Sequence, residues 1–155
     1  GYLAPEHQGY LERITTEMKQ SGFGDEFTYR GVVDRQHKIS FLQELDVLSV
    51  PATYNEPKGI FLLEAMACGV PVVQPRRGGF TEVVERTGGG LLVAPDSVES
   101  LAEGLLHLQQ NPIMARELSD NGFLRVREFY SVARMADSAV EAYDSVCNPA
   151  RTATR

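Results

Sequence analysis

Two glutamates, Glu56 and Glu64, stand out because of what surrounds them. Glu64 lies in the apolar run 60–67, where burying an unpaired charge costs several kcal/mol, so we expect a partner for it there. A carboxylate accepts two hydrogen bonds at once, which suits Glu64 to the neighbouring hydroxyls of a ribose. Glu56 precedes the apolar run and suits the hydroxyls of a sugar. Gly59, between the two, lets the backbone come close to a ligand.

The residues around these glutamates predict a strand, a loop, a helix and a second strand. Residues 47–50 form a brief, β-branched run that is stopped by Pro51, which is typical of a buried strand. A helix rich in Leu, Ala and Met is expected to begin near Gly59. A second strand is expected at residues 70–73. Together they form a βαβ crossover, in which ligands lie beyond the carboxyl ends of the parallel strands.

The start of the predicted helix favours an anion. The free amides of Gly59, Ile60 and Phe61, with the helix dipole, suit a phosphate. The cationic side chain of Lys58 either helps to bind that phosphate or faces solvent. Amides that donate hydrogen bonds to phosphate, beside two glutamates that accept hydrogen bonds from sugar hydroxyls, are what a nucleotide-sugar site requires. From spacing alone, however, the two glutamates equally suit the acid and the nucleophile of a glycosidase.

These residues resemble the signature of the group 1 retaining glycosyltransferases of the GT-B fold. In that family two glutamates are separated by seven residues, and the second opens a Glu-Ala-Met-Ala-Cys-Gly-Val-Pro-Val-Val run that is followed by Gly-Gly-x-x-Glu; here these features are Glu56, residues 64–73 and residues 78–82. The resemblance implies an α/β fold with a Rossmann-like parallel sheet flanked by helices. One departure is Lys58, where the family usually has an apolar or aromatic residue.

The resemblance also implies an activity, the transfer of a hexose from a nucleoside diphosphate sugar to an acceptor hydroxyl with retention. It implies that Glu56 is the catalytic residue that touches the transferred sugar and that Glu64 holds the ribose of the donor. By position, Gly31, Val32 and Val33 are expected near the nucleotide base, although a plain strand end is an equal interpretation. Two other hypotheses are a non-catalytic nucleotide-sugar-binding module and a nucleotide-sugar epimerase of the same fold.

Residues 1–147 are expected to form one such domain, truncated at its N-terminal side, and residues 148–155 a frayed tail. In the family, a preceding domain binds the acceptor, which here would be a sugar, a lipid or a small molecule. The chain alone is therefore expected to bind nucleotide weakly and to have no detectable transfer activity. Gly78 and Gly79, after the second strand, allow either a close approach to ligand or a tight turn.

Composition excludes several classes of protein. A chain of 155 residues with a net charge of −6 is long enough for one domain and too acidic for broad nucleic-acid binding. Its two cysteines make neither a disulfide framework nor a zinc site, and Cys68 is expected in the core. With no Asp-x-Asp motif, we expect neither a metal nor another cofactor. No apolar stretch is long enough to cross a membrane and no signal peptide is visible, so the cytoplasm is the expected compartment. Peripheral membrane contact of the full-length protein is left open.

Periodicity and capping residues predict the remaining elements. These are helices over 6–21, over 35–45 with Asp34 as cap, over 82–85 with Thr81 as cap, from 96 or 97 to 111, over 113–128 and over 131–146, and strands over 27–33 and 91–93.

Overall fold

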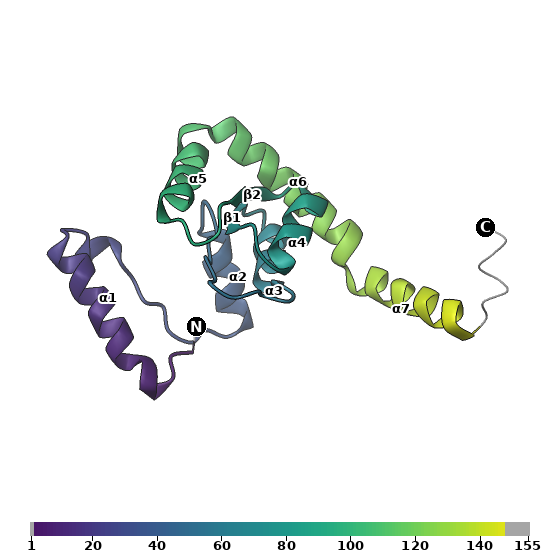
Figure 1. Ribbon diagram of the computed structural model, residues 1–155, viewed down its shortest axis with the longest axis horizontal. Coiled ribbons are helices and arrows are strands. Elements are labelled where there is room, and N and C mark those ends of the chain that lie inside the picture. Colours follow the sequence, from purple (N-terminus) through teal and green to yellow (C-terminus); the bar gives the residue numbers. More distant parts are fainter. Residues whose placement is uncertain (1, 148–155) are drawn as a thin grey trace. The chain divides into compact units, whose positions relative to one another are not determined.

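A computed structural model describes residues 2–147 and divides the chain into two units, one ending at Phe41 and one beginning at Leu42 (Figure 1). Helices alternate with two short parallel strands in the second unit, so the chain has the predicted α/β class. The described part of the first unit contains helices and irregular segments but no strand.

Helix α1 (Gln8–Gln20), which follows the short helix η1 (Pro5–His7), is the main element of the first unit. It carries half-buried apolar residues at the spacing that predicted it, namely Leu11, Ile14 and Met18. The chain turns after α1 at Gly22, whose φ of 83° favours glycine. No residue between 2 and 41 is fully buried.

The prediction of a strand over residues 27–33 is wrong. The short helix η2 (Gly24–Glu26) precedes this segment, and the segment itself is irregular. A strand needs a neighbour to accept its backbone hydrogen bonds. Within residues 2–147 no segment forms a β-ladder or a β-bridge with residues 27–33, so alternation of side chains is not enough to make a strand there.

Helix α2 (Arg35–Gln43) has the predicted cap. Oδ1 of Asp34 accepts a hydrogen bond from the amide of His37 at 2.9 Å. This backbone hydrogen bond, followed by the side-chain hydrogen bond to His37, lowers the pKa of the Asp34 carboxyl. The helix buries Leu42 and ends at Gln43 rather than at residue 45.

The sheet of the second unit consists of β1 (Val72–Pro75) and β2 (Gly90–Val93). The two strands are parallel, with Val72 opposite Gly90 and Pro75 opposite Val93. β2 lies where the sequence predicts it, whereas β1 begins and ends two positions later than the predicted 70–73.

Residues 47–50, predicted as a full strand, contribute a single bridge from Leu48 to β1. The amide of Val50 donates instead to the side-chain Oε1 of Gln74 at 3.3 Å. Pro51 follows and has no amide hydrogen to donate. The ladder therefore stops after one pair, and the fully buried Gln74 side chain takes the place of the next strand carbonyl.

Helices α3 (Ile60–Ala67) and α4 (Gly79–Thr87) lie on either side of β1 in the sequence. α3 begins where it is predicted. α4 is longer than expected and starts ahead of Thr81, because Gly78 turns the chain into the helix with a φ of 51°. Thr81 is consequently inside the helix, and the prediction that it is the cap is wrong.

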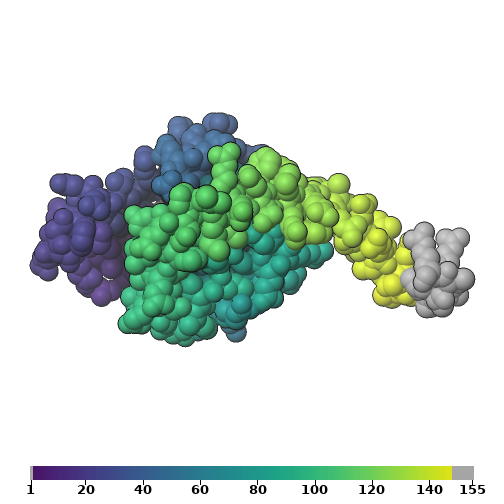
Figure 2. Space-filling model, turned by 90° about the horizontal axis from the view of Figure 1, so that it is seen from above, coloured from purple at the N-terminus to yellow at the C-terminus, as the bar shows by residue number. Residues whose placement is uncertain are grey.

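The last three helices follow the predicted pattern: α5 (Val98–Gln110), α6 (Pro112–Tyr130) and α7 (Val132–Cys147). Ser97 caps α5, since its Oγ accepts the amide hydrogen of Ser100 at 3.0 Å. Figure 2 shows the side chains of α5 and α6, in green, forming one face of the second unit.

The core of the second unit lies between the sheet and helices α3, α4 and α6. Its fully buried apolar residues include Leu62, Met66, Val72, Val73 and Phe80. A Cβ at Gly89 would lie 2.7 Å from the Cα of Gly122, so glycine permits the close approach of α6. Arg127 of α6 donates to the carbonyl oxygen of Ala67 at 2.9 Å and thereby caps the end of α3.

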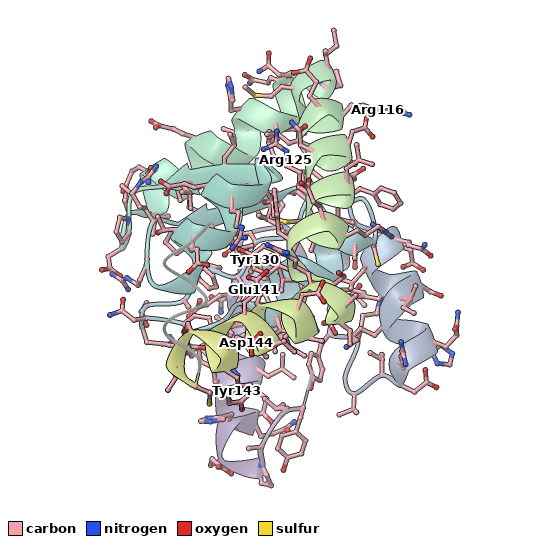
Figure 3. All side chains as sticks on the ribbon, turned by 90° about the vertical axis from the view of Figure 1, so that its right-hand side faces the viewer. Arg116, Arg125, Tyr130, Glu141, Tyr143 and Asp144 are labelled. Carbon is pink, nitrogen blue, oxygen red and sulfur yellow. The ribbon has the colours of Figure 1, made fainter. Side chains whose placement is uncertain are left out.

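Helix α7 packs against α6 and against no other helix or strand of the described chain. Its apolar side chains are exposed, including Tyr143, which Figure 3 labels beside Glu141 and Asp144 on the same helix. Within residues 2–147 no helix combines the length and the apolar character that crossing a membrane requires.

Candidate functional site

Three loops leave the same edge of the sheet. They are residues 51–59 after the Leu48 bridge, residues 76–78 after β1 and residues 94–97 after β2. Because the paired segments are parallel, this is their carboxyl edge, where parallel α/β sheets bind ligands. Glu56 and Lys58 therefore lie on the edge that the sequence predicts for the site.

Two contacts join these loops to one another. The amide of Gly79 donates to the carbonyl oxygen of Glu56 at 2.7 Å and links the second loop to the first. The guanidinium of Arg77 forms an ion pair with the carboxylate of Asp96 and links the second loop to the third. The edge is thus a connected structure rather than three independent loops.

The Glu56 carboxylate is held by the residues next to it. Oε1 accepts hydrogen bonds from the amides of Lys58 at 3.1 Å and Gly59 at 3.2 Å, and Oε2 accepts one from the Tyr54 hydroxyl at 3.3 Å. The amide of Gly59 contributes most, then that of Lys58, to a pKa of Glu56 below its ordinary 4.5. Glu56 is therefore ionised at neutral pH, and Oε2 has room for a further hydrogen bond.

Position 59 requires glycine because of its backbone conformation and because Phe80 lies close to it. Its φ of 63° is left-handed, and a Cβ there would lie 3.2 Å from Cδ1 of Phe80. The ring of Phe80 also meets that of Phe61 edge-on, with centroids 5.7 Å apart. The ring of Phe80 thus takes the space that a side chain at position 59 would need. Since the amide of Gly59 donates to Glu56, the amides of Ile60 and Phe61 are the ones left at the helix start without an intrahelical acceptor.

Glu64 lies one helical turn after Ile60 on α3 and is half-buried. The inner side of α3 is formed by Leu62, Ala65 and Met66, all buried, whereas Ile60 is 56 % exposed. Residues four apart share a helix face, so Glu64 falls on the same outer side as Ile60. Glu64 is therefore only partly enclosed by its apolar neighbours on α3. The two glutamates flank the start of α3, with Glu56 before it and Glu64 on its outer side.

The other predicted donor-binding residues are divided between the two units. Lys58 is exposed beside Glu56 in the second unit. Gly31, Val32 and Val33 belong to the first unit, where Val32 and Val33 are exposed and Gly31 has a φ of 63°. Their placement near the nucleotide base stays a prediction.

Sequence reasoning missed three features of this edge: the hydrogen bond from the Tyr54 hydroxyl, the contact between Gly79 and Glu56, and the pairing of Arg77 with Asp96. The glycine pair was a visible signal, and in the structure it packs against the backbone of the loop that carries Glu56. Arg77 and Asp96 are separated in the chain by α4 and β2, so no local pattern connects them.

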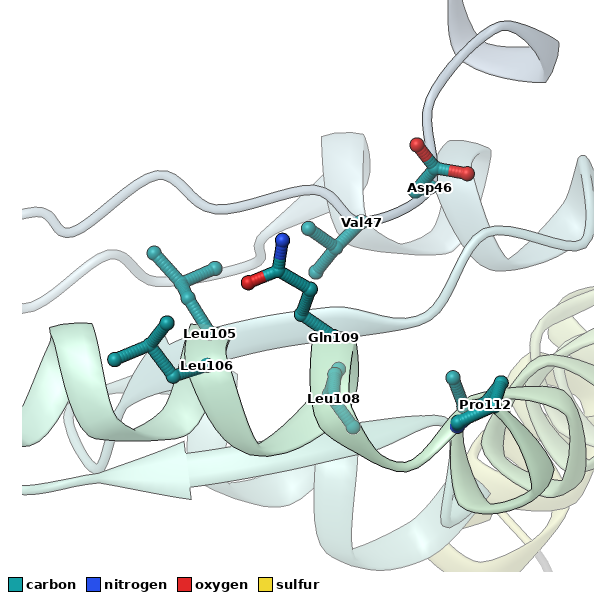
Figure 4. Close-up of a pocket in the computed structure, with 8 residues that line it drawn as sticks. Asp46, Val47, Leu105, Leu106, Leu108, Gln109 and Pro112 are labelled. Atoms are coloured by element: carbon teal, nitrogen blue, oxygen red, sulfur yellow. The ribbon is translucent and has the colours of Figure 1, made fainter.

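The second unit has a hollow at each end of its sheet. One, of about 350 Å³, lies at the carboxyl edge and is lined by residues that include Thr53, Pro75, Val93 and Ser97. The other, of about 650 Å³, lies at the amino end, where Val47 faces the end of α5 (Figure 4). We do not assign the larger hollow to the donor, because ligands of parallel sheets bind at the carboxyl edge.

No cluster of three or more His, Cys, Asp or Glu side chains that could hold a metal ion occurs within residues 2–147. The expectation of metal-independent chemistry stays a prediction. Cys68, expected in the core, is half-buried, and burial is the main cause that raises the pKa of its thiol.

Comparison with known proteins decides the family. The family model described as glycosyl transferases group 1 matches residues 7–125, most of the chain. The chain belongs to the group 1 glycosyltransferases. The match includes both glutamates and the whole carboxyl edge of the sheet.

Among its relatives, this glycosyltransferase chain is similar to the alpha-maltose-1-phosphate synthase of Mycolicibacterium smegmatis, with 39 % identity over 117 residues, which are 71 % of the chain and 30 % of the relative. The solved structure of a sucrose-phosphate synthase from Thermosynechococcus elongatus has a TM-score of 0.81 and 30 % identity, with 94 % of this chain and 37 % of that one covered.

A third similar protein is HepE of Anabaena, solved in complex with UDP and glucose. Its TM-score is 0.83, its identity 23 %, and the likeness covers 94 % of this chain and 39 % of HepE. These neighbours have the GT-B fold, which the sequence predicted. The group 1 chain spans less than half the length of each protein that it matches here.

Proposed function

We propose that this chain is the donor-binding part of a glycosyltransferase that moves a hexose from a nucleoside diphosphate sugar to an acceptor hydroxyl with retention. The observation that carries the proposal is the ionised Glu56 at the carboxyl edge, immediately ahead of α3, with Glu64 on the outer side of the same helix. Family membership supports the class of reaction. HepE, which has the same fold, binds UDP and glucose in its solved structure.

Each predicted residue has a role in this proposal. Glu56 accepts a hydroxyl of the transferred sugar at Oε2, because Oε1 already accepts two amides. Glu64 accepts the two hydroxyls of the ribose. The amides of Ile60 and Phe61 meet the diphosphate, with Lys58 as an added cation. Gly31, Val32 and Val33 meet the base in the same scheme.

The reaction itself breaks the bond between the anomeric carbon and the diphosphate oxygen, and the electron pair stays on that oxygen. The acceptor oxygen bonds to the anomeric carbon, and its proton passes to the leaving diphosphate oxygen. Donors that are fixed before the reaction, such as helix-start amides, stabilise the charge that develops on the leaving diphosphate. No metal or cofactor is part of this scheme.

In the glycosidase alternative, Glu56 could be the nucleophile but not the general acid. A glycosidase needs one carboxyl that stays protonated near neutral pH, and environments that do this raise its pKa. The amides of Gly59 and Lys58 lower the pKa of Glu56 instead. Glu56 is thus suited to accept hydrogen bonds and unsuited to act as a general acid.

The proposal is tested by titrating the chain with UDP-glucose and with GDP-mannose while amide NMR signals are recorded. We expect weak saturable binding of one donor, with the signals of residues 58–61 moving, and no transfer by the chain alone, since the acceptor is bound by the rest of the longer protein. Glu103→Gln, on the exposed side of α5, is the control and should bind as the parent does. No saturable binding of either donor would contradict the proposal. Conversion of the donor without acceptor would indicate an epimerase.

A further inference from the structure

The turn at Gly78 and Gly79 fits against the backbone of the loop that carries Glu56. A Cβ at Gly78 would lie 2.6 Å from the carbonyl oxygen of Glu56, and one at Gly79 would lie 2.8 Å from that of Pro57. The amide of Gly79 donates to the Glu56 carbonyl at 2.7 Å. The backbone position of Glu56 is therefore set by this turn, which has no space for a side chain.

Arg77, the residue before this turn, is unusual for an arginine because its side chain is only 15 % exposed. Its Nη2 pairs with Oδ2 of Asp96, and its Nη1 is buried without a hydrogen-bond partner among the described atoms. The neighbouring pair of Arg76 and Glu85 is different, since both of its side chains are more than half exposed. A mostly enclosed guanidinium is costly to leave unpaired, so Asp96 matters to Arg77 far more than Glu85 matters to Arg76.

We propose that Arg77 is a positioning residue for Glu56, and that its ion pair with Asp96 holds the Gly78–Gly79 turn against the Glu56 loop. The inference deepens the proposed function and rests on it, because it concerns how Glu56 is presented to the donor sugar. Asp96 lies in the loop 94–97 that follows β2, and its φ of 57° is unusual for a residue other than glycine. The pair therefore ties the loop after β1 to the loop after the neighbouring strand.

The first test needs no donor. Asp96→Asn keeps the shape of a side chain that is mostly exposed and removes its charge, and Arg76→Ala is the matched control at the adjacent exposed pair. In Asp96→Asn we expect the Gly79 amide to exchange its hydrogen about tenfold faster, as local opening predicts, with the Lys58 and Gly59 signals moving too. Arg76→Ala should leave all three unchanged.

Exchange at Gly79 that is equally slow in Asp96→Asn and in the parent would overturn the proposal. Arg77→Ala is expected to act in the same direction more strongly. If it does not fold, Asp96→Asn alone decides. The exchanged pair, Arg77→Asp with Asp96→Arg, should restore slow exchange at least in part, which a merely disruptive substitution would not allow.

The second test separates this inference from the proposed function by comparing UDP-glucose with UDP. Because Glu56 is proposed to bind the sugar, Asp96→Asn should weaken binding of UDP-glucose about tenfold and leave that of UDP unchanged, as for one lost hydrogen bond to a charged group. Faster exchange with unchanged UDP-glucose affinity would mean that the Arg77–Asp96 ion pair only stabilises the turn. That result would overturn the positioning role of Arg77. If the parent binds neither ligand, the proposed function fails while the exchange result still stands.

Discussion

Oε1 of Glu56 accepts the amide hydrogen of Gly59 at 3.2 Å, so the side chain that is proposed to bind the sugar also closes the turn into α3. The same hydrogen bond is the main cause that lowers the pKa of the carboxyl. The orientation of the Glu56 side chain and the start of α3 therefore depend on the same hydrogen bond.

This relationship predicts a pH dependence. The pKa of Glu56 is lower in the folded chain than its ordinary 4.5, so the stabilisation is complete above that value and is lost as pH falls through the folded-state pKa. The melting temperature of the parent should exceed that of Glu56→Gln at pH 7, and the difference should shrink below pH 4.5. A carboxyl carbon of Glu56 that titrates by NMR at or above the ordinary value would contradict this.

Substitution of Gly59 by alanine tests the packing at the same turn. The left-handed backbone alone costs an alanine about 1–2 kcal/mol, and the contact with Phe80 adds about 1–3 kcal/mol. Gly88→Ala is the control, because Gly88 has a φ of 60° and its nearest neighbour would be 4.0 Å from a Cβ. Urea unfolding should show a larger loss for Gly59→Ala than for Gly88→Ala. Equal losses would mean that the Phe80 contact is unimportant.

Ser119 links α6 to the turn after α3, since its Oγ donates to the carbonyl oxygen of Gly69 at 2.5 Å. Ser119→Ala should destabilise the second unit by about 1 kcal/mol, the usual contribution of one such hydrogen bond. Ser145, on exposed α7, bonds within its own helix and provides the control, with an expected effect near zero. Thermal unfolding measures both, and a Ser119→Ala variant as stable as the control would contradict the prediction.

The two cysteines should differ in reactivity. Burial raises the pKa of the Cys68 thiol, which leaves less thiolate at pH 8, while Cys147 is exposed. Iodoacetamide should therefore label Cys147 first, as mass spectrometry of timed samples would show. Faster labelling of Cys68 would indicate an activated thiol and remove its assignment as a packing residue.

The sequence predicts well those features that neighbouring residues determine. The helix at Gly59, the Asp34 and Ser97 caps and the long helices after Asp96 all depend on local spacing and capping. The failures depend on distant contacts. Residues 27–33 form no β-ladder with any segment of residues 2–147, and Gln74 ends the ladder at Leu48.

The residues of the predicted site also differ in whether neighbouring residues or distant contacts determine them. The two glutamates are recognisable from their own motif, and Glu56 lies at the expected edge. Arg77 and Asp96 come together only after α4 and β2 have folded, so nothing in either local sequence reveals the pair. The partial burial of Glu64 likewise depends on which side of α3 meets the core, and an almost uniformly apolar helix does not reveal this.

The most direct test of the donor site is the affinity of the chain for UDP and GDP and for their 2′-deoxy forms, measured with the parent and with Glu64→Gln. If Glu64 binds the ribose, loss of the 2′-hydroxyl should weaken binding of the preferred nucleotide to the parent about tenfold, and should cost Glu64→Gln nothing further. Equal affinity of the parent for both forms, or equal sensitivity of Glu64→Gln, would contradict the assignment of Glu64 to the donor.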